Sequence, residues 1–177
     1  MSKTITLNLS KALIFEAVKA ESFDTGQTDK AADPARNAAA ASYEQAGGEP
    51  HNERILLRHL KSAIGKFEAQ MGEFLEPQTG SVSDTLSSTQ DTFTIRLVVS
   101  DRFNNGLATP LSSLCEDFLV CHMLASWWNV FKPEYAKNYY LNAQDALNHA
   151  RLCFSKTSPN AAGGDYTDVT GTVNYNS

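Results

Sequence analysis

Five cysteine and histidine residues are the side chains of this sequence most able to do chemistry, because thiolates and imidazoles bind zinc and act as nucleophiles or bases. His149 and Cys153 are four positions apart in a helical pattern, so they share one helix face. Cys121 and His122 are neighbours and point about 100° apart on a helix, which disfavours joint binding of one ion. The sequence therefore predicts no metal site and three structural cysteines. A metal-dependent enzyme remains an alternative, and it would use Cys115, Cys121, His122, His149 and Cys153.

Motifs of other enzyme classes are missing from the sequence. The two pairs of adjacent glycines, Gly47-Gly48 and Gly163-Gly164, do not follow strand patterns, so neither predicts a phosphate-binding loop. There is no Gly-x-Ser-x-Gly or His-Glu-x-x-His motif. His122, inside an apolar helical pattern, is expected to be a hydrogen-bonded core histidine. We expect neither enzymatic activity nor a bound cofactor.

The densest aromatic cluster lies around the junction of two predicted helices. It contains Trp127, Trp128, Phe131 and Tyr135. One interpretation is the tight corner of a helical hairpin. The other is a subunit interface, because Trp and Tyr are enriched in interface cores. Neighbouring aromatics point in different directions, so both interpretations stay open.

The last residues form a second candidate interface. Residues 157–177 contain no Lys or Arg, and residues 165–175 are rich in Thr, Val and Tyr. This composition is typical of a strand, but its apolar area is too small to fold alone, so disorder is one expectation. The other is an arm that adds a strand to a neighbour's sheet, with contacts from Tyr166, Val169, Val173 and Tyr175.

Composition places the chain among ordinary soluble globular proteins. It has 177 residues, 42% of them hydrophobic, which suits one domain, expected over residues 1–159 with a polar arm at 160–177. A net charge of −5 argues against nonspecific nucleic-acid binding. Three cysteines indicate a reducing compartment, and the first residues lack the apolar run of a signal peptide. No membrane association is expected.

Hydrophobic periodicity predicts the elements that position these residues. Alternation over 4–9 and 92–99 predicts two strands, and the second should pair with the first, with part of 80–90, or with another subunit. Helices are predicted over 10–23, with Ser10 as the cap, and over 34–45, 51–76, 110–131 and 134–155. Residues 24–32 are expected to form a loop, and residues 77–91 a loop or a mobile hairpin arm. Two of these helices carry an apolar core stripe: Leu57, Leu60, Ile64, Phe67, Met71 and Phe74 in 51–76, and Ala136, Tyr140, Ala143, Leu147, Ala150 and Phe154 in 134–155. The expected fold is α+β and mainly α: a bundle of about four helices with a small antiparallel sheet and extended arms.

Four segments taken in order resemble head–tail connector (neck or adaptor) proteins of tailed phages of gut bacteria. They are the helix Arg54 to Leu60, the strand Asp91 to Ser100 leading to Asn104, the helix ending Trp127 to Phe131, and the run from Glu134 through Arg151 to Pro159. The resemblance covers about residues 1–20 and 53–159, and the Ala-rich 34–45 and the polar tail depart from it.

The resemblance implies a virion structural protein assembled in the host cytoplasm. Such proteins form homo-oligomeric rings, often of twelve copies, between the portal and the tail or other neck proteins, and DNA passes through the ring without specific binding. The alternatives are a tail-completion or tail-terminator protein and a cytosolic helical adaptor that binds one protein partner.

Overall fold

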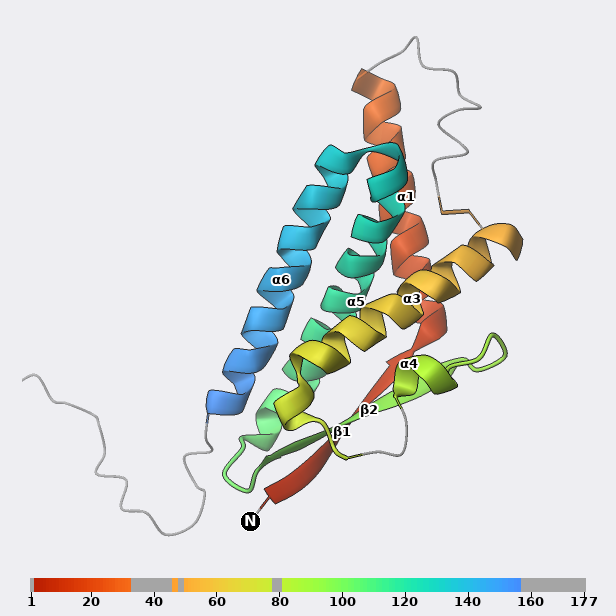
Figure 1. Ribbon diagram of the computed structural model, residues 1–177. Helices are drawn as coiled ribbons and strands as arrows, with labels where there is room; N and C mark the ends of the chain where they lie inside the picture. The colour runs from red at the N-terminus through yellow and green to blue at the C-terminus, as the bar shows by residue number, and fades with distance from the viewer. Residues whose placement is uncertain (1, 33–45, 48–49, 78–80, 157–177) are drawn as a thin grey trace, which may run out of the picture.

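The structure is a computed structural model that describes residues 2–32, 46–47, 50–77 and 81–156 (Figure 1). A two-stranded antiparallel sheet packs against helices, which confirms the mainly α form of the α+β class. In chain order the elements are β1 (Ser2–Ser10), α1 (Lys11–Ala32), α3 (Pro50–Gln70), the 3₁₀ helix η1 (Gly72–Phe74), α4 (Val82–Thr85), β2 (Thr92–Ser100), the 3₁₀ helix η2 (Asn105–Leu107), α5 (Ala108–Phe131) and α6 (Pro133–Ser155).

The two strands pair along nine residues, as the first of the predicted pairings requires. The register places Leu7 opposite Ile95 and Leu9 opposite Phe93. Because side chains alternate across a strand, these odd-numbered residues all point to one face, and the structure buries them. The even-numbered residues form a polar outer face, so the sheet has one face packed on the helices.

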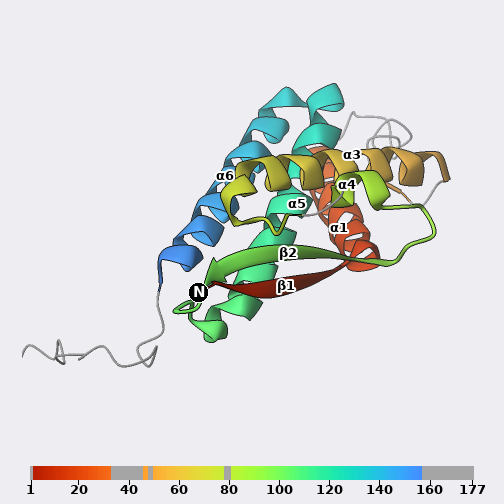
Figure 2. The same cartoon turned by 60° about the horizontal axis from the view of Figure 1, so that its bottom comes forward.

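Helix α5 is the centre of the bundle. It packs against α6, α3, α1 and β1, as Figures 1 and 2 show. Because neighbours surround it, apolar residues are buried around most of its circumference, as its sequence predicts. On α3 the predicted stripe faces this centre, and the Phe67 ring lies 5.5 Å from that of Phe118. No described helix is long and apolar enough to cross a membrane.

Helix α1 is longer than predicted. The sequence predicts a loop at 24–32, but the helix continues to Ala32. Tertiary contacts explain the difference, because the hydroxyls of Thr25 and Tyr139 are hydrogen-bonded at 2.9 Å and Ser22 Oγ, fully buried, accepts from Ala46 N at 3.1 Å. These contacts stabilise a helical turn that the local polar sequence does not favour. The helix predicted at 34–45 and the arm at 160–177 lie outside the described residues.

The segment after α3 also differs from its prediction. Helix α3 ends at Gln70, before the predicted end at 76, and η1 follows. Within the predicted loop lies the short α4, whose first N–H groups are capped by side chains: Ser81 Oγ accepts from Ser83 N at 3.1 Å and Glu68 Oε1 accepts from Val82 N at 2.9 Å. One of the two caps on α4, Glu68, therefore comes from another helix, and a local pattern does not reveal it.

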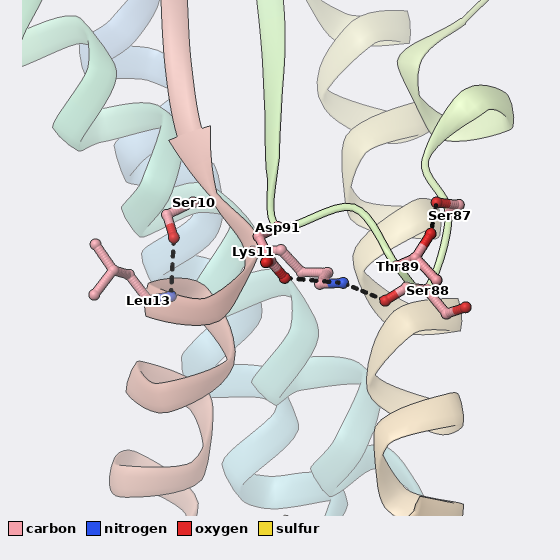
Figure 3. A network of polar contacts seen from close by, with 7 residues as sticks. All are labelled: Ser10, Lys11, Leu13, Ser87, Ser88, Thr89 and Asp91. Atoms are coloured by element: carbon pink, nitrogen blue, oxygen red, sulfur yellow. Dashed lines mark hydrogen bonds and ion pairs between the residues drawn. The ribbon is translucent and has the colours of Figure 1, made fainter.

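A polar network joins the end of β1 and the loop before β2 to the first turn of α1 (Figure 3). Ser10 Oγ accepts from Leu13 N at 3.3 Å, which confirms Ser10 as the predicted cap. Lys11 N donates to Asp91 O at 2.8 Å, and Lys11 Nζ donates to Ser88 O at 2.6 Å. Lys11 is only 8% exposed, so this ammonium group holds the loop before β2 against the sheet.

Candidate functional site

The cysteine and histidine residues do not converge. Cys115 and Cys153 are buried, Cys121 is half-buried, and His149 is exposed on α6. Within the described ranges, no three His, Cys, Asp or Glu residues are grouped closely enough to hold a metal ion. Burial raises the pKa of the Cys115 thiol, and burial together with Glu21 and Asp117 raises the pKa of Cys121 to about 11. Both shifts disfavour the thiolate, which is the form that ligates metal or acts as a nucleophile.

His122 is a core residue, as predicted, but its Nδ1 has no hydrogen-bond partner among the described residues. Burial, and then the nearby charges of Lys66 and His59, lower its pKa to about 4. The imidazole is thus neutral at pH 7 and packs near the Phe118 ring, at 5.7 Å. It lacks the features of a catalytic base with an aligned nucleophile.

A shallow groove of about 370 Å³ lies over His122, between α5 and α6. Lys66 and Lys137 lie at this groove. Its one hydroxyl from α5, Ser126 Oγ, donates to His122 O at 2.9 Å within the helix. Because that hydroxyl satisfies the helix backbone, Ser126 is not arranged as an activated nucleophile.

The aromatic cluster divides between the core and the surface. Trp127 and Trp128 are 4% and 0% exposed, so both pack inside this chain and offer almost no area to another one. The Trp128 ring meets Tyr135 edge-on at 5.8 Å, across the turn between α5 and α6. Phe131 is 45% exposed. The tryptophans therefore form the corner of the helical hairpin. Among the predicted interface residues of this cluster, only Phe131 and, in part, Tyr135 reach the surface. Tyr166, Val169, Val173 and Tyr175 lie outside the described residues.

Two exposed leucines, missed by the sequence reasoning, lie on the outer side of α6. Leu141 and Leu152 are 52% and 55% exposed and stand eleven positions apart, about three turns. Asp145 and Asn148 fall between them on the same stripe, and we call these four residues the α6 outer face. Tyr140, which the predicted core stripe of α6 includes, is also exposed. The sequence did contain a signal for this surface, because Leu141 and Leu152 lie outside the Ala-rich core stripe of α6.

The α1–α5 side of the bundle carries negative charge. Burial and the neighbouring Asp117 and Asp24 raise the pKa of Glu21, although a hydrogen bond with Tyr139 opposes this. Burial and Asp117 likewise raise the pKa of Glu116. We call Glu21, Asp24, Glu116 and Asp117 the acidic cluster. These carboxylates lie close enough to raise one another's pKa.

Comparisons of this chain with protein-family models, with curated proteins and with solved structures find no match. A function must therefore be argued from the chain's own residues. Those residues offer apolar surfaces, with no assembled catalytic or metal-binding group among the residues described.

Proposed function

We propose that this chain is a structural subunit of the connector, or neck, between the head and tail of a phage virion, and that it works as a homo-oligomeric ring between portal and tail. The observation that carries the proposal is the α6 outer face, with Leu141 and Leu152 more than half exposed on a well-packed bundle. The resemblance of its four sequence segments to connector proteins supports the same role.

The energetics favour a protein partner on this surface. Full burial of a leucine side chain contributes about 1.5–3 kcal/mol, and because these two leucines are about half exposed, covering them adds about half of that each. This gain offsets part of the cost of association. Val130 and Phe131 at the hairpin corner are 76% and 45% exposed and are further apolar side chains that a partner could cover. A ring requires two different surfaces on each copy, because its contacts are head-to-tail.

Charge suits the passage of DNA through such a ring. The chain carries a net charge of −5, and the acidic cluster concentrates negative charge on α1 and α5. Phosphates bind where lysine and arginine neutralise them, so an acidic subunit holds DNA weakly. Such a channel would let the duplex slide without being retained.

The α6 outer face can be tested in the full chain. A Leu141→Glu/Leu152→Glu variant places charge on the proposed contact and should weaken self-association about tenfold or more, measured by mass photometry over a dilution series. The matched control is Asn142→Glu/His149→Glu, which changes two exposed residues of the same helix, rotated about 90° from the leucines.

Three results would contradict the proposal in different ways. Equal assembly of the leucine variant and the control would remove the α6 outer face from the interface. A wild-type chain that stays a monomer or dimer, and binds no portal protein, would favour the cytosolic adaptor. Assembly only with tail proteins would favour a tail-completion or terminator protein.

A further inference from the structure

The outer edge of β1 has no pairing partner in the part of the chain that the structure describes. The outer edge of β2 is occupied, because Glu76 N donates to Arg96 O at 3.0 Å and Leu75 forms a bridge with Leu97. β1 pairs only with β2, and no described main-chain group bonds its other edge. Figure 2 shows β1 at the margin of the sheet. A strand with one unpaired edge is a template for another strand.

This edge lacks the features that usually protect an exposed strand. Natural edge strands are kept apart by short length, bulges, proline or projecting charges. β1 has nine residues in unbroken register and no proline. Its one charged residue, Lys3, is turned to the chain itself, where Nζ donates to Phe103 O at 2.8 Å and to Asn105 Oδ1 at 2.7 Å. Small polar side chains, Thr6 and Asn8 among them, remain on the outer face.

A hollow of mixed lining begins close to the end of this strand. Leu13, three residues after Ser10, is 62% exposed and lines a groove of about 210 Å³ between α1 and α5. Ala17 and Val120 add apolar lining, whereas Glu21, Glu116 and Asp117 of the acidic cluster also line the groove. A strand added to β1 could therefore cover the exposed Leu13 with a valine or tyrosine side chain, and its contact need not include the carboxylates.

We infer that residues 165–175 of a neighbouring copy pair with the outer edge of β1 as a third strand. Seven of these eleven residues are Thr, Val or Tyr, which favour strands. The chain leaves α6 near the first residues of β1: Phe154 packs on Phe103 at 6.1 Å, and Phe103 O binds Lys3. Residues 157–164 then supply a spacer that contains Pro159 and Gly163-Gly164.

The choice of a neighbouring copy rests on the proposed ring. In a ring every copy can give its arm to one neighbour and receive the arm of the other, so all strand edges are filled. The contact is main-chain hydrogen bonding along β1, with an apolar side chain of the arm over Leu13. It is independent of the α6 outer face.

The experiment compares variants of the full chain by native mass spectrometry over a dilution series. Asn8→Lys adds a projecting charge to the open edge, and Thr94→Lys, its cross-strand partner on the same face, is the control. Thr170→Pro/Val173→Pro removes two N–H donors from the arm, and Ala162→Pro in the spacer is its control. We expect each test variant to weaken assembly about tenfold or more, with both controls near wild type. Melting temperatures confirm that all variants fold.

The outcomes separate this inference from the proposed function. If the wild-type chain forms rings and neither test variant weakens them, or only one does, the strand pairing is overturned. The connector proposal would still stand. A wild-type chain that never assembles would overturn both. Amide exchange of β1 tests for pairing within one chain. If β1 is protected in wild-type monomers and loses that protection in the Thr170→Pro/Val173→Pro variant, the arm pairs with its own chain, which also contradicts the inference.

Discussion

At the residue scale, His122 makes stability depend on pH. Its pKa is lowered from the usual 6.5 to about 4. Between these pH values His122 is protonated in the unfolded chain and neutral in the folded chain. The free energy of unfolding should therefore fall as the pH drops from about 6.5 to about 4, by about 1.4 kcal/mol per unit and about 3 kcal/mol in total.

Urea unfolding at several pH values measures this effect. His122→Leu should show a shallower loss of stability over the same window, because the titrating group is gone. His149→Leu, at an exposed histidine, is the control. Parallel curves for wild type and His122→Leu would show that other groups account for acid sensitivity.

The acidic cluster should change stability with pH in the direction opposite to His122. The raised pKa of Glu21 means that its charged form is disfavoured in the folded chain, so ionisation lowers stability as the pH rises through the folded pKa. Glu21→Gln should raise the free energy of unfolding at pH 7, by about 0.5 kcal/mol or less because the side chain is only partly buried and solvent screens its charge. The gain should vanish below the usual glutamate pKa. Thermal melts test this, and an equal gain in Glu16→Gln would attribute it to net charge instead.

At the element scale, the stripe of α3 is the main anchor of the bundle. Phe67 is fully buried against Phe118. Phe67→Ala should lower the free energy of unfolding by about 3–5 kcal/mol through lost burial and a cavity. Phe23→Ala, at a side chain 48% exposed, should cost much less. Similar chemical-denaturation midpoints for the two variants would show that the α3 stripe is not the core.

Glu68 stabilises α4 from a neighbouring helix. Its carboxylate accepts from Val82 N at 2.9 Å and from Ser81 Oγ. Glu68→Ala should cost about 1–2 kcal/mol and speed amide exchange at residues 81–85. Glu73→Ala, on the exposed η1, supplies the control. Unchanged exchange in α4 would mean that Ser81 alone caps it.

Sequence patterns predicted the elements whose stabilising contacts are local or periodic. Both strands, the cap at Ser10 and the α5–α6 hairpin follow from alternation, capping chemistry and helical stripes. The patterns failed where distant residues decide the structure. The second half of α1 depends on Tyr139 and Ala46, and α4 depends on Glu68. These partners are far away in the sequence, so no window of residues contains them.

At the scale of the whole molecule, the candidate surface was harder to predict than the core. Tryptophan is typical of interface cores and of protein cores alike, so its type does not decide between them; Trp127 and Trp128 pack within this chain. Leu141 and Leu152 became visible as a surface only once the buried side of α6 was fixed. Exposure is a property of the assembled fold, and composition does not carry it.

The central claim is that copies of this chain build a ring. Negative-stain electron microscopy of the purified full chain, with the particle mass measured in parallel, tests it most directly. Ring assembly should give closed rings with a central channel and a mass that is a whole multiple of 19.4 kDa. Particles of one or two copies at every concentration, alone and with portal protein present, would contradict it.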